Sequence, residues 1–361
     1  METGIDTIKK LLSAKNIDGL IVTNPYNILY LTGFQGISPT EREATLTVTK
    51  DHATLITARL YQKEAQKVSS KNLKIKIANE RNEIDKFIES SLINATSVGF
   101  EEADLKYSEF LKYKKLLTPA KLVGQKNLIE DLRIVKSEDE ISKIEKAQLI
   151  TQKTFTQIIK TLKLGETEAE IAHKMASILR SLDAQGQAFE AIVASGPNSG
   201  KPHHVTGNRK IKNGDTLLFD FGAKYQNYCA DFSRTVFIGK ASDTQRNIYS
   251  HVLTAQKKAL DKIKHGIKNH EPYHAANNHF KKNRLEKYFT HGLGHGIGLE
   301  VHELPYLRTK INTKRLTNQM VFSVEPGLYF NWGGVRLEDL VTIKNGGLKI
   351  LGKLIDKIIE I

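Results

Sequence analysis

The alternation of hydrophobic and polar positions divides the chain into two parts. In the first part, short strand patterns rich in β-branched residues alternate with amphipathic helical patterns. The elements that we expect there are a helix over residues 1–16, strands at DGLIVTN, ATLTVTK, HATLITA, LKIKIAN and SVGFE, a helix over residues 83–92 and a helix in DLKYSEFLKYKKLL. The second and third of these strands are spaced as a hairpin. The pattern predicts an α/β domain over residues 1–126, which is within the usual size of a domain.

A long helical pattern opens the second part of the chain. The segment LIEDLRIVKSEDEISKIEKAQLITQKTFTQIIKTLKLG is rich in charge and ends at Gly165, a typical residue after a helix end. Further helices are predicted over residues 167–183, 244–264 and 272–288, with strand-like segments between them. Elements separated in this way predict a second domain of the α+β type, over residues 127–361.

Two aspartates stand on either side of a tight turn in LLFDFGAKYQNYCADFS. A symmetric hairpin with its turn over residues 224–227 places Asp220 opposite Asp231, with both side chains on one face. Because opposed like charges destabilise a sheet, a cation is the economical compensation, and carboxylates are hard oxygen ligands. The alternative is a different register, in which each aspartate meets solvent or a lysine.

The same arrangement recurs with glutamates about a hundred residues later. In SVEPGLYFNWGGVRLEDL, Glu325 and Glu338 flank a turn near residues 331–333, and the histidine-rich segment HGLGHGIGLEVHE lies between the two hairpins. Four carboxylates and one imidazole suffice for two divalent ions about 3.5–4 Å apart that share a water. This oxygen-rich set favours Mn²⁺, with Co²⁺ or Fe²⁺ as alternatives, over a thiolate-type zinc site.

Composition and charge narrow the class of protein. The 361 residues are 40% hydrophobic and 26% charged, as is usual for globular proteins, and no run of eighteen apolar residues or secretory signal pattern is present. The single cysteine, Cys229, permits no internal disulfide. We expect a cytoplasmic protein without a membrane partner. The formal charge of +14 comes from scattered lysines without interleaved aromatics, so we expect no nucleic-acid partner.

Four motifs in the second part resemble those of a known family. The segments FDFGAKYQNYCADFSRT, HGLGHGIGLEVHE, SVEPGLYF and GVRLEDL, in this order and spacing, resemble the Xaa-Pro peptidases, the aminopeptidase P and prolidase branch of the pita-bread metallopeptidases. NPYNILYLTGF resembles a segment of the creatinase-like domain that typically precedes them. The resemblance implies an α+β fold, with a pita-bread catalytic domain after a creatinase-like α/β N-terminal domain.

The resemblance also implies a ligand set for two metal ions. The implied ligands are Asp220, Asp231, His295, Glu325 and Glu338. Asp231 and Glu338 would bridge both ions. Asp220 would bind one ion, while His295 and Glu325 would bind the other. Glu325 also stands at the position of the family's proton shuttle.

Further residues match positions around the ligands. His203 and His302 stand where the family places active-site histidines, and His302 would hydrogen-bond the scissile carbonyl. His291 would line the pocket for proline, although a structural packing role is the alternative for each histidine and is most credible for this one. Tyr329 and Arg336 resemble residues that orient the ligands.

Two positions depart from the family pattern. His204 stands where relatives often carry glycine, and Asn227 replaces a common glycine in the first hairpin turn. We expect His204 to crowd the pocket or to add a polar contact. Both departures therefore affect the expected substrate preference more than the expected chemistry.

The motifs favour an Xaa-Pro aminopeptidase, which cleaves between an N-terminal residue and proline in peptides with proline at the second position. The alternative is an Xaa-Pro dipeptidase, which needs a cation for the carboxylate after proline. Tyr306 stands where some prolidase-like relatives carry arginine, which weakens this alternative, but Arg308 and Arg42 remain candidates. A methionine aminopeptidase usually lacks the N-terminal domain, and non-catalytic pita-bread binding modules typically lose ligands. The resemblance further implies a homodimer.

Overall fold

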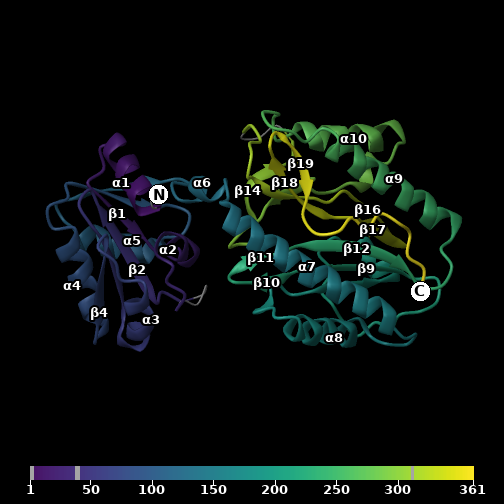
Figure 1. Ribbon diagram of the computed structural model, residues 1–361, viewed down its shortest axis with the longest axis horizontal. Coiled ribbons are helices and arrows are strands. Elements are labelled where there is room, and N and C mark those ends of the chain that lie inside the picture. The colour runs from purple at the N-terminus through teal and green to yellow at the C-terminus, as the bar shows by residue number, and fades with distance from the viewer. Residues whose placement is uncertain (1–3, 37–40, 310–312) are drawn as a thin grey trace. The chain divides into compact units, whose positions relative to one another are not determined.

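The chain folds into two compact units, Met1–Arg133 and Ile134–Ile361, in a computed structural model (Figure 1). The structure describes residues 4–36, 41–309 and 313–361. We call the two parts the N-terminal unit and the C-terminal unit, and each is described by itself. The domain border expected after residue 126 stays a prediction.

The N-terminal unit is a six-stranded mixed sheet with helices on both faces. The strand order is β4-β3-β2-β1-β5-β6. The strands are β1 (Gly19–Val22), β2 (Ala44–Thr49), β3 (Ala53–Ala58), β4 (Leu73–Ala78), β5 (Ser97–Glu101) and β6 (Lys121–Gln125). The helices are α1 (Gly4–Ala14), α2 (Pro25–Thr32), α3 (Gln62–Lys67), α4 (Arg81–Ser91), α5 (Tyr107–Leu116) and α6 (Glu130–Arg133). The predicted hairpin is present, because β2 and β3 pair antiparallel.

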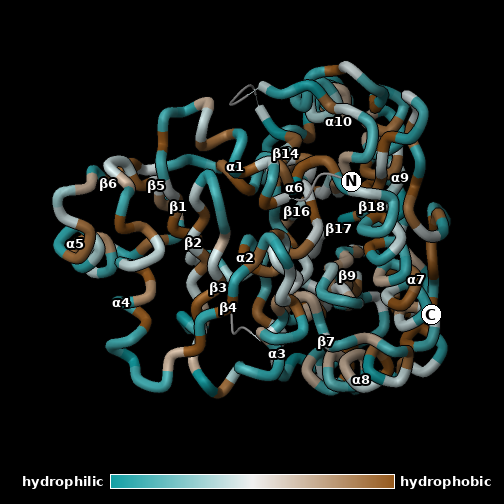
Figure 2. Tube along the Cα trace, turned by 60° about the vertical axis from the view of Figure 1, so that its left-hand side comes forward, coloured by the Kyte–Doolittle hydropathy of each residue, from teal (hydrophilic) through white to brown (hydrophobic). Residues whose placement is uncertain are grey.

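Alternate residues of the central strand β1 enter two different cores. Leu20 and Val22 pack with α1 and α2, while Ile21 packs with Ile88 of α4 and Tyr113 of α5. A strand buried on both faces has the continuous apolar pattern seen in DGLIVTN. Figure 2 shows hydrophilic and hydrophobic residues alternating along the outer helices, as amphipathic packing on a sheet requires.

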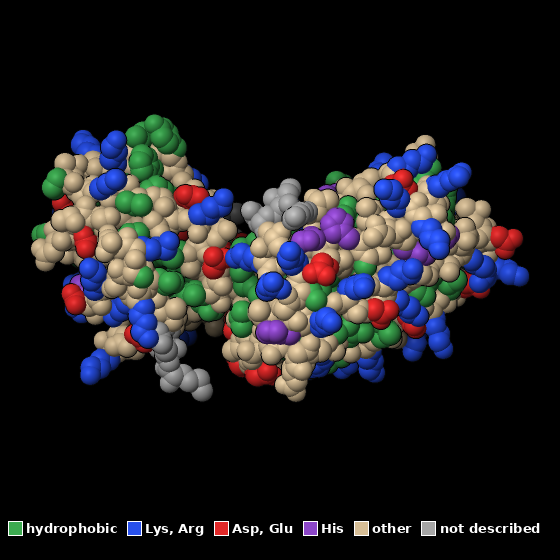
Figure 3. Space-filling view, turned by 90° about the horizontal axis from the view of Figure 1, so that it is seen from above, with side chains coloured by type: hydrophobic (Ala, Val, Ile, Leu, Met, Phe, Trp, Pro, Cys, Tyr) green, Lys and Arg blue, Asp and Glu red, His purple; other side chains and the backbone are tan. Residues whose placement is uncertain are grey.

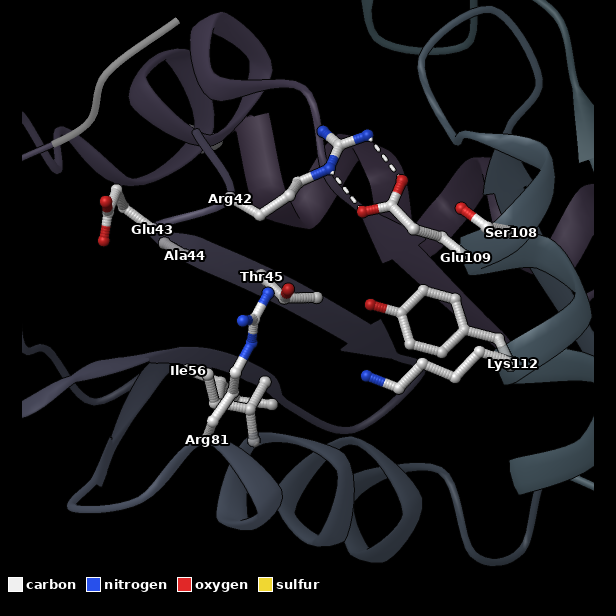
Figure 4. A pocket seen from close by; sticks show the side chains of 11 residues that line it. Arg42, Glu43, Ala44, Thr45, Ile56, Arg81, Ser108, Glu109 and Lys112 are labelled. Atoms are coloured by element: carbon white, nitrogen blue, oxygen red, sulfur yellow. Dashed lines mark hydrogen bonds and ion pairs between the residues drawn. The ribbon is translucent and has the colours of Figure 1, made fainter. Parts of the chain in front are cut away.

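A cavity of about 280 Å³ opens between α4 and α5, and two of its basic side chains, Arg42 and Lys112, pair with carboxylates of the same unit (Figure 4). Arg42 Nε lies 2.8 Å from Glu109 Oε1, and the same guanidinium contacts Asp104. Lys112 Nζ lies 2.6 Å from Asp85 Oδ1. Arg42, a sequence candidate for recognising a substrate carboxylate, is therefore occupied by two carboxylates of its own unit.

The C-terminal unit surrounds several small antiparallel sheets with helices. Its helices are α7 (Glu138–Thr161), α8 (Glu168–Ser181), α9 (Asp243–Leu260) and α10 (Glu271–Lys282), with 3₁₀ turns η2 (Gly196–Gly200) and η3 (Glu286–Tyr288). The strands are β7 (Gly186–Gln187), β8 (Ile192–Ser195), β9 (Thr216–Phe221), β10 (Ala223–Tyr225), β11 (Tyr228–Cys229), β12 (Phe232–Phe237), β13 (Gly294–Gly296), β14 (Glu303–Leu307), β15 (Val321–Val324), β16 (Gly327–Phe330), β17 (Gly333–Arg336), β18 (Asp339–Lys344) and β19 (Gly347–Ile350).

The long helical pattern that opens the second part is divided into α6 and α7, and α7 ends earlier than expected. Ser137 caps α7 in a capping box with Glu140. The helix ends at Thr161, four residues before the predicted end at Gly165, because Leu162 already has extended backbone angles. Similarly, the helix predicted over residues 272–288 is α10 followed by the separate turn η3.

Two apolar cores hold the strands of the C-terminal unit between helices. In one core, Phe155 of α7 packs edge-on against Phe219 of β9 and Phe232 of β12. In the other, Val252 of α9 and Phe280 of α10 pack with residues of β15 and β18. The strands that carry the candidate ligands are thus supported on both sides.

The described residues include no helix with the length and apolar character that crossing a bilayer requires. Figure 3 shows Lys and Arg side chains spread over the visible face and interspersed with Asp and Glu. The positive charges on this face follow the scattered pattern of the sequence.

Candidate metal centre

All five expected ligands line one cavity of about 460 Å³ in the C-terminal unit. Asp220 lies in β9, and Asp231 directly precedes β12. His295 is the middle residue of β13, while Glu325 directly follows β15 and Glu338 directly precedes β18. Each ligand therefore stands in or at the end of a strand, where the sheet fixes its backbone.

The aspartate hairpin differs in register from the sequence-based expectation. Asp220 pairs with Ser233, not with Asp231. The turn is formed by Gln226 and Asn227, which both have positive φ, as in a two-residue hairpin turn. The expected turn was one residue too early, which shifts the pairing by two. Because side chains repeat every two residues along a strand, Asp231 stays on the same face as Asp220, on the diagonal.

The glutamate hairpin follows the expected register. Val324 pairs with Asp339, and Gly327 pairs with Arg336. Both pairs belong to one continuous register, in which Glu325 stands opposite Glu338 at the junction between the two sheets. The two hairpins are joined, because the amide of Glu338 donates to the carbonyl of Ser233 at 3.1 Å.

His295 lies between carboxylates from both hairpins. Its Nε2 is 3.2 Å from Glu325 Oε1 and 3.6 Å from Asp231 Oδ2. Its Nδ1 faces the carbonyl of Gly296 at 3.0 Å and donates to it, which leaves Nε2 as the ligand atom. Ligand atoms of Asp231, His295 and Glu338 all lie within 4.8 Å of one another. This spacing suits the coordination of a shared cation.

Two buried carboxylate oxygens in this group lack a hydrogen-bond partner among the described residues. They are Oδ1 of Asp231 and Oε1 of Glu338. Burial raises the pKa of both carboxyls well above the usual values, and the neighbouring carboxylates raise it further. Buried, unpartnered carboxylate oxygens are costly unless a cation compensates them. The residues present therefore fit a divalent metal ion.

Glu325 and His295 form an ion pair within this group. Burial acts to raise the pKa of Glu325, but the hydrogen bond with His295 lowers it below the usual value. Burial likewise acts to lower the pKa of His295, but Glu325 raises it to about 9. Since a metal-ligating imidazole is neutral, metal binding at His295 would release a proton.

The strand that carries His295 passes unusually close to its neighbours. A Cβ atom on Gly294 would lie 2.0 Å from the carbonyl oxygen of Ser323, and one on Gly296 would lie 2.1 Å from that of Leu304. Both contacts are with backbone, which cannot move aside as a flexible side chain can. Only glycine fits on either side of His295.

Arg336 joins the residues expected around the ligands. Its Nη2 donates to Asp220 Oδ2 at 2.6 Å and its Nη1 donates to the Tyr329 hydroxyl at 2.8 Å. The Tyr329 hydroxyl also lies 2.8 Å from His291 Nε2. The guanidinium is buried, and its Nε donates a hydrogen bond to the Ser233 hydroxyl at 2.8 Å. The Arg336 guanidinium thus orients Asp220 and Tyr329 directly, and it orients His291 through Tyr329.

His203 and His302 line the same cavity as the ligands. The ring of His302 is 4.3 Å from that of His295, measured between centroids. Partial burial, and then the neighbouring His295, lower the pKa of His302. His302 is therefore a neutral imidazole at pH 7 and can act as a hydrogen-bond donor without carrying a charge.

The structure adds one residue, Ser323, that the sequence analysis did not include among the candidates. The Ser323 hydroxyl accepts from the amide of His295 at 3.0 Å and donates to Glu325 Oε1 at 2.9 Å. Its place two residues before Glu325 in a strand, on the same face, was the available signal. Of the two expectations for His204, crowding of the pocket is wrong, because the residue does not line the cavity, and its ring makes a polar contact with Glu168 instead. Asn227 is also outside the cavity lining.

Comparisons with known proteins agree with this geometry. The model of metallopeptidase family M24 matches residues 142–345, and that of the Creatinase/Prolidase N-terminal domain matches residues 5–135. The chain is 34% identical over 355 residues to an Xaa-Pro dipeptidase of Pyrococcus furiosus, with 98% of each chain covered.

Two solved structures resemble the whole chain. An Xaa-Pro dipeptidase from Bacillus anthracis shares 30% identity with a TM-score of 0.93, and 99% of each chain is covered. An X-Pro aminopeptidase from Thermotoga maritima shares 31% identity with a TM-score of 0.87, and 96% of this chain and 98% of that one are covered.

The fold and the site together define a pita-bread metallopeptidase preceded by a creatinase-like domain. The chain belongs to metallopeptidase family M24, among the Xaa-Pro peptidases. The resemblance inferred from the four motifs and the fold class that it implied are confirmed.

Proposed function

We propose that the chain is an Xaa-Pro dipeptidase that uses a dinuclear centre of divalent ions. The motif-based preference for an aminopeptidase gives way to its alternative, because the archaeal relative and the Bacillus anthracis structure are both named as Xaa-Pro dipeptidases. The observation that carries the proposal is the presence of Arg308 in the lining of the ligand cavity.

Arg308 is suited to recognise the carboxylate of a dipeptide. Its guanidinium carbon lies 4.9 Å from the centre of the Tyr306 ring, and both side chains line the cavity. Among the residues that the structure describes, Arg308 pairs with no carboxylate of the protein. A guanidinium held on an aromatic face keeps its donors available, and it binds a carboxylate with charge-assisted hydrogen bonds.

In the proposed reaction, the protein residues have separate roles. Divalent ions held by the five ligands would supply Lewis-acid activation and a reactive water, and the oxygen-rich ligands favour Mn²⁺, or Co²⁺ or Fe²⁺. Glu325 takes a proton from the attacking water and passes it to the proline nitrogen that leaves. His302 and His203 face the scissile bond, and His302 donates to its carbonyl oxygen. His291, held by Tyr329, contacts the proline ring.

The dipeptidase proposal predicts a selective effect of Arg308→Ala. The value of kcat/KM for an Xaa-Pro dipeptide should fall about 10- to 100-fold, the scale of a lost hydrogen bond to a charged group. Hydrolysis of the same dipeptide with an amidated C-terminus should change little, because no carboxylate is present. Arg308→Lys should give an intermediate loss, and Arg180→Ala, an exposed change on α8, should have no effect.

An Xaa-Pro aminopeptidase is the second candidate, favoured by the Thermotoga maritima structure and by Tyr306 at a position where some prolidases carry arginine. An aminopeptidase must leave room for the chain beyond proline. If the parent protein prefers Xaa-Pro tripeptides to dipeptides and Arg308→Ala leaves both rates unchanged, the second candidate replaces the first.

We also propose that the protein is a homodimer. The resemblance to Xaa-Pro peptidases supports this assembly, in which N-terminal domains often pair. Light scattering at micromolar concentration should give about twice the monomer mass of 40.6 kDa. A mass equal to that of one chain would remove this proposal.

A further inference from the structure

The segment that carries His203 has little regular structure to hold it. It leaves β8 at Ser195, passes through the short turn η2, and then runs over residues 201–208 without helix or strand. Its contact with the ligands is indirect, because the carbonyl of Pro202 accepts from Arg336 Nη1 at 3.2 Å. A loop without a backbone ladder needs side-chain partners to hold one conformation.

The side chain that contacts this segment at several points is that of Glu168, the first residue of α8. Its side chain has no exposed surface, yet both carboxylate oxygens are used. Oε1 accepts from the backbone amide and the hydroxyl of Ser195, both at 2.7 Å, and from the side-chain Nδ2 of Asn198 at 3.0 Å. Oε2 accepts from His204 Nε2 at 2.8 Å and from the Gly207 amide at 3.3 Å.

These hydrogen bonds make Glu168 a buried anion. Burial acts to raise its pKa, but the hydrogen bonds from Asn198, His204 and Ser195 outweigh burial and lower the pKa below the usual value. A buried carboxylate with five donors is a rigid anchor, because moving any donor away leaves charge unpaired. The anchor spans the loop from Ser195 to Gly207, on both sides of His203.

His204 gives this chain a fifth donor where relatives often carry glycine. Only 10% of its side chain is exposed, and it lies against Glu168 while its neighbour His203 lines the ligand cavity. Fixing the ring of His204 fixes the backbone of the adjacent residue. The orientation of His203 in the cavity thus depends on a contact that lies outside the cavity.

We propose that Glu168 and His204 are positioning residues that hold His203 at the substrate. The proposal rests on the proposed peptidase function, because the role of His203 is part of it. Neither residue is a metal ligand or lines the cavity, so their effect on hydrolysis passes through the loop.

A double-mutant cycle tests this positioning role. His204→Ala should lower kcat/KM for an Xaa-Pro dipeptide about tenfold, with metal content unchanged, and His204→Gln, which keeps a donor, should recover most of the loss. In the His203→Ala background, the same His204→Ala change should cost less than about twofold, since there is no ring left to position. His173→Ala, at an exposed histidine of α8, is the matched control.

Multiplicative losses in the cycle would overturn the proposal, because they would mean that His204 acts independently of His203. Equal losses from His204→Ala and His204→Gln would also contradict it. Glu168→Gln should repeat the pattern. If Glu168→Gln fails to fold, the double-mutant cycle at His203 and His204 still tests the proposal, because the His204 variants keep the other four donors to Glu168.

Hydrogen exchange gives a readout that is independent of peptidase activity. The amides of residues 196–207 should exchange faster in His204→Ala and not in His173→Ala. If the parent protein hydrolyses no Xaa-Pro peptide, the proposed function fails and the positioning of His203 for catalysis fails with it. Unchanged exchange in an active His204→Ala variant would instead overturn only the anchoring.

Discussion

Removal of divalent ions with a chelator should abolish hydrolysis of Xaa-Pro dipeptides, and added Mn²⁺ or Co²⁺ should restore it. The expected loss is at least about 10³-fold, because metal ions stabilise transition-state charge by several kcal/mol. The physical reason is visible in Asp231 and Glu338, because one buried oxygen of each, Oδ1 and Oε1, has no hydrogen-bond partner among the described residues. Dipeptide hydrolysis and elemental analysis, followed on the same samples, measure both changes.

Variants at Asp231 and Glu338, the two positions proposed to bridge the ions, should separate metal binding from a general loss of structure. Asp231→Asn and Glu338→Gln keep side-chain size but remove one charge each, so bound metal and turnover should fall together. Glu190→Gln, an exposed change in the same unit, should alter neither. Full activity in a preparation shown to be free of metal would refute the mechanism.

His302→Ala should reduce kcat by about 10² or more and leave the bound metal unchanged. His302 lines the cavity beside the candidate ligand His295, but it is not in the group of Asp231, His295 and Glu338 whose ligand atoms converge. Loss of a hydrogen-bond donor to the transition state has an effect of this size. Because the lowered pKa makes His302 neutral at pH 7, His302→Gln, which also donates without charge, should recover part of the rate.

The same metal measurement decides the role of His302. A variant that loses an ion would show that His302 supports the ligands and not the scissile carbonyl. His173→Ala, at an exposed histidine, is the control for an unspecific effect of removing an imidazole. A fall in kcat with constant metal content in His302→Ala alone supports the assigned role.

The sequence predicts which face of a hairpin a side chain occupies better than it predicts register. Asp220 and Asp231 share a face, because a shift of the pairing by two residues leaves the face of each side chain unchanged, and the pairing is shifted by two residues. The shift arises because Gln226 and Asn227 both adopt positive φ and form the turn by themselves. In the glutamate hairpin, the turn expected near residues 331–333 agrees with strand ends at Phe330 and Gly333, and the register follows.

Side-chain partners that are distant in sequence could not be predicted. Arg42 was a candidate for binding substrate, but Asp104 and Glu109 of the same unit hold it. His204 was expected to crowd the pocket or to add a polar contact, and its polar contact is with Glu168, 36 residues earlier. In both cases the residue type indicates a polar partner, while only the fold determines which partner is near. The five candidate ligands line one cavity, because the motifs place them in or beside strands that meet there, and their role as ligands stays a prediction.

The close backbone approach around His295 limits how this centre can evolve or be engineered. Gly294 and Gly296 have no side chain with which to bind a metal, yet a methyl group on either would meet a backbone carbonyl and push the strand, and the imidazole with it, away from the carboxylates. Attempts to retune metal preference by diversifying the segment HGLGHG would therefore sample few folded variants. Ser323, whose hydroxyl accepts from the His295 amide and donates to Glu325, is also fully buried, so the centre is constrained from this side as well.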